Sequence, residues 1–155
     1  MTNGAREGPL LTPAVRGTPC SIAAALEIIG DRWSLLILRE LNLGHHRFSD
    51  MVRNTGASRD RLAARLKALV AAGVLERIEY QQSPSLSAYH LTDAGRELSP
   101  VLHVLRQWGD RWAVARPPVT VRHRDHELRL GGTCDVCGEP VHEDDVTRVR
   151  LGEDA

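Results

Sequence analysis

The feature that most constrains this chain is a basic amphipathic segment near its centre, residues 57–69. Its leucines recur at i, i+4 and i+7, the spacing of one helix face: Leu62, Leu66 and Leu69. Its basic side chains lie off that face: Arg61, Arg65 and Lys67. Ser58 stands where a helix N-cap belongs. A capped helix with an apolar back and a basic front suits the major groove of DNA, so the segment predicts a recognition helix.

The residues before this segment predict three further helices. The first runs from Ser21 to Ile29 and stops at Gly30. Asp31 can cap a second helix, Arg32 to Leu41, which is apolar nearly all round and is expected at the centre of the core. A short third helix is lined by Phe48, Met51 and Val52. A turn containing Gly56 then leads into the basic helix, which completes a helix-turn-helix.

Two strands are expected after the basic helix, Val74 to Tyr80 and Ala88 to Leu91, joined by a polar loop over residues 81–87. Such a hairpin is a β-wing. The predicted fold class is therefore mainly α with a small β-wing, a winged helix-turn-helix followed by a small C-terminal β appendage.

Thr92 or Asp93 is expected to cap one long final helix. One side of this helix carries an apolar stripe, formed by Leu98, Val101, Leu102, Leu105, Trp108 and Trp112. A small domain has little core left to cover so long a stripe. We therefore expect the stripe to meet the same stripe of a second subunit.

Charge is distributed unevenly, although the formal net charge is zero. Residues 1–118 carry 15 basic and 11 acidic side chains, whereas residues 119–155 carry 5 and 9. Residues 32–77 carry 9 basic and 4 acidic side chains. Because salt screens charges beyond about 10 Å, the local balance decides contact with phosphate. The central part therefore favours nucleic acid, and the acidic C-terminal part does not.

Composition divides the chain into a flexible N-terminal arm (1–19), the winged helix with its final helix (20–116) and, after Pro117-Pro118, a small tail (119–155). No apolar run reaches the roughly 20 residues of a membrane span, and no signal peptide is visible. Three cysteines do not make a secreted disulfide framework. A cytoplasmic protein with reduced thiols is expected.

Residues spread over positions 20–112 also match one known pattern in register. They are Cys20, Ile29-Gly30-Asp31-Arg32-Trp33, Leu36 to Leu41, Gly44, Arg47-Phe48, Ser58, Leu62, Arg65-Leu66, Leu69, Gly73-Val74-Leu75, Tyr89-His90-Leu91-Thr92, Gly95, Pro100-Val101-Leu102 and Trp108-Gly109. In these residues the chain resembles the HxlR-type winged-helix regulators, relatives of the MarR group. The resemblance implies bacterial, homodimeric, DNA-binding transcription regulators, usually repressors and sometimes activators. It also implies dimerisation through the first and last helices, with an interface formed by Ile22, Leu26, Leu102, Leu105, Trp108 and Trp112.

We expect DNA contacts from the recognition helix through Ser58, Arg59, Arg61, Arg65 and Lys67. Gln81 and Gln82 are expected to reach phosphate or sugar from the wing. The alternative for both sets is a solvated polar surface. The chain departs from its relatives at Leu86, where the wing tip often carries Arg. Asp60, near the outward face of the helix, accepts from a cytosine amino group, orients a neighbouring arginine, or repels phosphate.

Cys20 lies at the predicted start of the first helix, where free N–H groups and the helix dipole favour a thiolate. The functional interpretation is a redox or electrophile sensor, which the resemblance supports because some relatives use a cysteine here. The alternative is an inert cysteine packed at a helix end.

The tail contains a possible structural zinc site. Cys134 and Cys137 have the C-x-x-C spacing that binds one metal within a tight turn. His123 and His126 are the first choice for the other two ligands, and His142 is the substitute. In a continuous strand residues three apart face opposite sides, so both His side chains bind only if the chain bends between them. The alternative is a small dithiol hairpin without metal.

The sequence therefore favours a non-enzymatic DNA-binding regulator with a double-stranded operator as its partner, no required cofactor, and a small-molecule or thiol signal. One rival is a small dithiol oxidoreductase that uses Cys134 and Cys137, although that chemistry expects C-x-x-C at the start of a helix. The other rival is a winged helix that serves as an interaction module and does not bind DNA. The zero net charge and Leu86 are its support.

Overall fold

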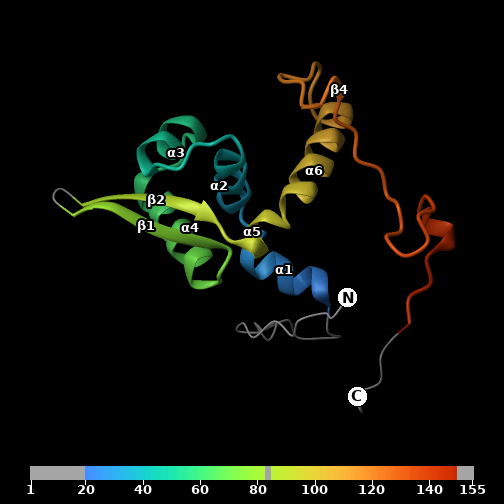
Figure 1. Cartoon of the computed structure of the whole chain (residues 1–155), viewed down its shortest axis with the longest axis horizontal. Helices are drawn as coiled ribbons and strands as arrows, with labels where there is room; N and C mark the ends of the chain where they lie inside the picture. The colour runs from blue at the N-terminus through green and yellow to red at the C-terminus, as the bar shows by residue number, and fades with distance from the viewer. Residues whose placement is uncertain (1–19, 83–84, 150–155) are drawn as a thin grey trace, which may run out of the picture. The chain divides into compact units, whose positions relative to one another are not determined.

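The computed structural model describes residues 20–82 and 85–149. They form two compact units, with the boundary between Leu102 and His103. The first unit holds α1, α2, α3, α4, the strands β1 and β2, and α5 (Figure 1). The helix α6, Ser99–Trp112, begins in the first unit and continues into the second. The predicted boundary at Pro117-Pro118 stays a prediction.

The first two helices form as predicted. Helix α1 spans Ser21–Ile29, and α2 spans Arg32–Asn42. The Asp31 carboxylate accepts the backbone N–H of Trp33 at 2.8 Å, which satisfies one of the free donors at the start of α2.

A tight turn joins α3, Phe48–Thr55, to α4, Arg59–Ala71. Gly56 ends α3 in the left-handed region at φ 71°, a conformation that costs a side-chain-bearing residue free energy. The Ser58 hydroxyl accepts the backbone N–H of Arg61 at 3.4 Å and caps α4. The helix-turn-helix predicted around the basic segment is therefore present.

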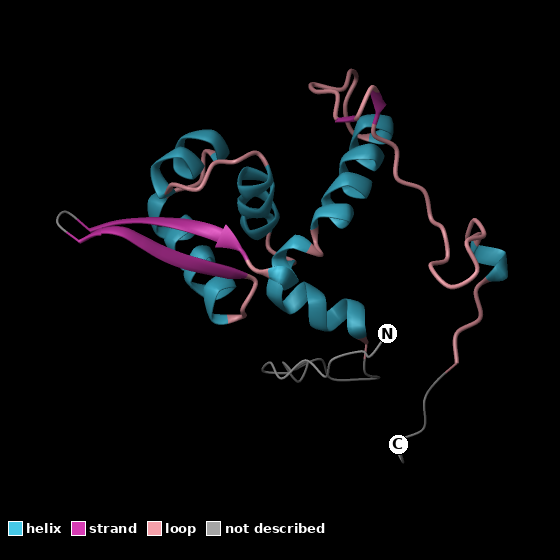
Figure 2. Ribbon diagram, in the orientation of Figure 1, coloured by secondary structure: helices cyan, strands magenta, loops and turns pink. Residues whose placement is uncertain are grey.

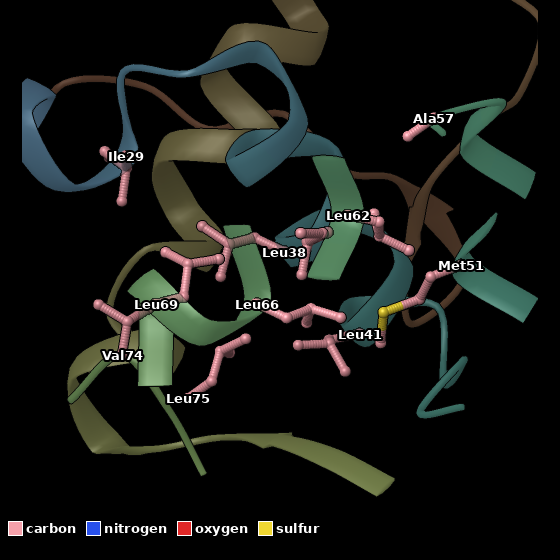
Figure 3. Packing of buried hydrophobic residues seen from close by; sticks show 11 residues of the cluster. Ile29, Leu38, Leu41, Met51, Ala57, Leu62, Leu66, Leu69, Val74 and Leu75 are labelled. Carbon is pink, nitrogen blue, oxygen red and sulfur yellow. The ribbon is translucent and has the colours of Figure 1, made fainter. Parts of the chain in front are cut away.

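The core of the first unit is formed mainly by α2, α3 and α4 (Figure 3). The stripe predicted on α4 is fully buried: Leu62, Leu66 and Leu69. Ile37, Leu38 and Leu41 of α2, together with Met51 of α3, pack against it. Each such side chain stabilises the folded unit by about 1.5–3 kcal/mol through its burial.

The wing consists of β1, Leu75–Gln82, and β2, Ser85–Leu91, paired antiparallel from Leu75↔Leu91 outward (Figure 2). The polar loop predicted over residues 81–87 is wrong, since backbone pairing continues through Gln82↔Ser85. The sequence did not indicate strands here because residues 81–87 are mostly polar and show no apolar alternation. A shift in register between Glu79 and Gln81 interrupts the pairing.

The prediction of a single long final helix is also wrong. Thr92 caps a short helix α5, Asp93–Arg96, and α6 starts afresh at Ser99. Pro100 explains the break, because proline has no N–H to continue the hydrogen-bond ladder of the preceding turn. Gly95 packs so closely on the Val74 carbonyl that a Cβ there would collide with it.

In the second unit, β3, Arg122–His123, pairs antiparallel with β4, His126–Glu127. The two strands are joined by a turn in which Arg124 adopts φ 55°. A second hairpin is marked by the bridge Thr133↔Pro140, and the short 3-10 helix η1 spans Glu143–Asp145. Across the described parts of the chain, no helix is both long and apolar enough to cross a membrane.

Candidate nucleic-acid interface

The exposed side of α4 combines small and charged side chains. Ala64 and Ala68 are exposed on the side of the helix opposite the buried leucines. Asp60 and Lys67 are exposed beside them. Because alanine adds little bulk, this face can approach base edges within a major groove about 12 Å wide.

The arginines of α4 flank this face. The Arg59 guanidinium lies 4.9 Å from the centroid of the Phe48 ring, which holds it against α3. Arg65 is half-buried and lines a shallow hollow with Asp31 and Trp33 at the start of α2. Arg61 borders the same hollow but is exposed. The lateral positions of Arg59 and Arg65 suit phosphate better than base edges.

A buried carboxylate fixes α3 against α2. Glu40 of α2 is 1% exposed, and it accepts hydrogen bonds from Asn54 at 2.7 Å and from Arg39 at 2.6 Å. Glu40 Oε2 also lies 2.8 Å from His45 Nδ1. Burial raises the pKa of Glu40, but the hydrogen bonds from Asn54, Arg39 and His45 outweigh burial and leave the pKa below its ordinary value. The ionised group therefore holds the start of the helix-turn-helix in place.

The segment before α3 also ties the wing to the helices. The backbone N–H of Tyr89 donates to the His46 carbonyl at 2.9 Å, and Arg47 forms an isolated bridge with Ala88 of β2. The rings of His46 and His90 stack with centroids 4.5 Å apart. These contacts fix the angle at which the wing leaves the helix-turn-helix.

Arg47 is a candidate contact that the sequence analysis missed. It is exposed at the N-cap of α3, and its guanidinium lies 6.0 Å from the centroid of the Tyr80 ring of the wing. A cation between helix and wing is well placed for a phosphate. Local sequence could not indicate this position, because it depends on the pairing of residues 41 positions apart along the chain, Arg47↔Ala88.

The predicted wing contacts are only partly described. Gln81 and Gln82 belong to the end of β1, and their side chains lie outside the described part of the structure. Leu86 is 40% exposed on β2. Farther back, the Arg77 Nε donates to the Ser87 hydroxyl at 2.9 Å.

The predicted dimer residues divide into two groups. On α1, Ile22 and Leu26 are exposed. On α6, Leu105, Trp108 and Trp112 are exposed, with exposed fractions of 48%, 60% and 70%. Leu102 differs, because it is half-buried and packs with Leu98 against the core of its own subunit. Leu98 and Leu102 therefore contribute to the core of their own subunit, whereas Val101 of the stripe is exposed, and dimerisation through the stripe stays a prediction.

The thiols lie in two different settings. Cys20 is exposed at the N-cap of α1, with an extended backbone. Cys134 and Cys137 lie in the second hairpin of the tail, and all three cysteines are free. The pKa of Cys134 is lowered, first by the backbone N–H of Cys137, then by that of Val136 and by the Cys137 side chain.

The tail residues proposed as metal ligands lie on two hairpins. His123 and His126 face each other across the β3–β4 turn, so the bend that both would need is present. His142 directly precedes η1. In residues 20–82 and 85–149, no group of three or more His, Cys, Asp or Glu side chains is arranged to hold one metal ion.

A capped, basic helix on a helix-turn-helix, followed by a two-stranded wing, defines a winged helix-turn-helix protein of the class that regulates transcription. The HxlR-like helix-turn-helix family model matches residues 28–117, and this chain belongs to that family. The resemblance seen in the sequence is thereby confirmed.

Known relatives agree with this assignment. The uncharacterized HTH-type transcriptional regulator Rv3095 of Mycobacterium tuberculosis is 41% identical over 133 residues, which cover 82% of this chain and 83% of the relative. The solved structure of PA1607, described as a candidate transcription factor, superposes with a TM-score of 0.74 at 36% identity and covers 85% of this chain and 95% of its own. The redox regulator HypR in its oxidized form matches with a TM-score of 0.56 at 26% identity, over 62% of this chain and all of HypR.

Proposed function

We propose that this chain acts as a dimeric repressor that binds a specific double-stranded operator. The observation that carries the proposal is the division of α4 into a fully buried leucine side and an exposed side bearing Ala64, Ala68 and Lys67, with Arg61 at its edge. In a dimer, two such helices enter successive major grooves roughly 34 Å apart. Occupied operator DNA is then closed to the transcription machinery.

Within this proposal the DNA contacts have different roles. Arg61 and Lys67 reach base edges or adjacent phosphates from the exposed side of α4. Arg59 and Arg65 lie at the sides of α4 and bind the flanking phosphates. Ser58 marks the N-terminus of α4, where backbone N–H groups contact the same DNA backbone. Gln81 and Gln82 of the wing supply further backbone contacts.

The dimer is supported by the apolar side chains that each subunit leaves exposed. On α1 these are Ile22 and Leu26, and on α6 they are Leu105, Trp108 and Trp112. Exposed aromatic side chains on a helix of a small domain are a typical mark of an interface. A second copy of the chain is the occupant, because a paired operator needs two recognition helices.

Regulation is proposed to act on the spacing of the two α4 helices. Cys20 directly precedes the exposed face of α1, so modification of its thiol would alter the proposed subunit contact. The similarity to HypR, named a redox regulator, supports a thiol signal. A small molecule held between subunits would act on the same contact.

The dithiol oxidoreductase that the sequence left open receives no support from the site. Cys134 and Cys137 lie in a hairpin turn, whereas thioredoxin-like exchange uses a cysteine at the start of a helix. The relatives are named as transcriptional regulators. A regulator is therefore the function we propose.

In vitro selection from a random duplex library tests the proposal with the full-length chain. The expected result is enrichment of an inverted repeat whose half-site centres are about 10–10.5 base pairs, or a multiple of that, apart. Affinity for the selected duplex should fall steeply with salt. Selection that enriches no sequence would contradict the operator, and a monomer at micromolar concentration in equilibrium sedimentation would contradict the dimer.

A further inference from the structure

The tail keeps a defined local structure with almost no burial. Over residues 131–149, every side chain except that of Cys134 is exposed. A segment of this size has too little apolar surface to be held by a core of its own. A structural metal is the usual substitute in so small a unit, since metal binding supplies folding free energy directly.

The cysteine hairpin is shaped to present two sulfurs together. The Gly138 N–H donates to the Cys134 carbonyl at 2.8 Å, and the Cys134 N–H donates to Glu139 at 2.9 Å. Gly138 adopts φ 76°, which allows the chain to reverse directly after Cys137. The tight turn of the C-x-x-C segment places both cysteines at one end of the hairpin, the arrangement in which two thiolates bind one metal.

The histidine hairpin presents two imidazoles in the same way. Because Arg124 turns the chain at φ 55°, the rings of His123 and His126 meet with centroids 5.3 Å apart and planes at 87°. Two imidazole nitrogens about 2.0–2.1 Å from a tetrahedral Zn²⁺ place the ring centroids about 5 Å apart. The Asp125 carboxylate lies 3.2 Å from His126 Nδ1, which leaves Nε2 for a metal.

We propose that one Zn²⁺ joins these two hairpins within a subunit, bound by the two thiolates of Cys134 and Cys137 and by His123 and His126. Each hairpin supplies two of the four ligands. Among the described residues no group of three or more such side chains surrounds one point, so the proposed site requires the two hairpins to approach each other. Among the seven residues between His126 and Cys134, Gly131 supplies backbone freedom for this approach, whereas the Gly132 carbonyl accepts the Val141 N–H within the cysteine hairpin. Two thiols release their protons when the metal binds.

Elemental analysis of the full-length chain, purified without chelator from zinc-supplemented culture, tests the proposal. We expect about one zinc per subunit, and Co²⁺ in its place should give the intense visible absorption of a tetrahedral thiolate site. Replacing both Cys134→Ser and Cys137→Ser should abolish binding of either metal. Replacing His126→Gln should lower Zn²⁺ affinity by at least about tenfold.

His142→Gln is the matched control, because His142 lies next to the cysteine hairpin but outside the proposed ligand set. It should keep its zinc. Absence of zinc together with absence of a Co²⁺ spectrum in the parent would overturn the site. A stoichiometry of one zinc per two chains that is unaffected by His123→Gln and His126→Gln would also overturn it. The same conclusion would follow if His142→Gln loses its zinc while His126→Gln keeps it. The thermal transition of the winged helix reports whether each variant is folded.

Discussion

The winged helix and the tail of this chain are stabilised in opposite ways. In the winged helix, α2, α3 and α4 bury leucines, isoleucine and methionine completely, and even the buried carboxylate of Glu40 has hydrogen-bond partners. In the tail, residues 131–149 keep their turns through backbone hydrogen bonds such as Val141 to Gly132, while their side chains remain exposed, Cys134 excepted. The charge balance also reverses, from net basic over residues 32–77 to net acidic after residue 118.

This difference separates two tasks within one short chain. A helix that reads DNA must keep its orientation when it binds, and the packed leucine side of α4 provides that rigidity. The tail has a net acidic charge, which disfavours contact with the phosphate backbone, so we expect it to take no part in reading DNA. Perturbing each region should therefore affect different measurements.

The largest effect is expected from the core. Leu66→Ala removes a fully buried side chain between α2 and α4 and should lower the free energy of unfolding by about 2–5 kcal/mol. Urea unfolding followed by circular dichroism measures it. The matched truncation in the tail, Val136→Ala, changes a side chain that is 96% exposed and should stay within about 0.5 kcal/mol. Equal effects of the two variants would remove the contrast between the regions.

The same contrast decides what could be predicted from the sequence. The helices of the core were predictable because their apolar spacing and their caps, Asp31 and Ser58, agree with each other. The extended wing was missed at residues 81–87, because these mostly polar residues show no apolar alternation. The break before α6 could be predicted only by giving Pro100 more weight than the continuous apolar stripe.

The candidate site shows the same limit. The exposed side of α4 followed directly from its periodicity. The contact of Arg59 with Phe48 and the placement of Arg65 beside Trp33 could not be read from the sequence, since both depend on how α4 packs against α3 and α2. Arg47 was missed for a related reason, because it approaches the wing only through tertiary pairing.

Glu40 should give the next largest effect. Glu40→Gln removes the charge from hydrogen bonds with Arg39 and Asn54 and should cost about 1.5–3 kcal/mol of unfolding free energy at neutral pH. Because its folded pKa is lowered, the ionised carboxylate stabilises the protein above the ordinary carboxyl pKa, and this contribution is lost as pH falls through the folded pKa. The difference between parent and variant should therefore shrink on acidification. Exposed Glu76→Gln is the control, and a difference that grows at low pH would contradict the assigned sign.

The basic face of α4 should give a smaller effect, seen in binding and not in stability. Arg61→Ala should weaken affinity for the selected duplex by about 1–2 kcal/mol, the lower part of the range for a base contact because Arg61 lies at the edge of the face. Lys67→Ala, if it loses a phosphate contact, should reduce the salt slope by about one unit. Fluorescence anisotropy over a salt series measures both quantities. Arg148→Ala, an exposed arginine of the tail, should leave them unchanged.

The smallest effect on the winged helix is expected from the tail cysteines. Replacing Cys134→Ser and Cys137→Ser together should change operator affinity and the unfolding of the winged helix by less than about 0.5 kcal/mol, because neither sulfur contributes to the apolar core cluster. The amides of residues 132–141 should nevertheless exchange hydrogen faster, since the turn loses the proposed metal. Val136→Ala, a substitution in the same turn that keeps both sulfurs, is the control. If the cysteine pair instead lowers operator affinity severalfold, the tail shapes the reading surface, and the two regions are energetically coupled.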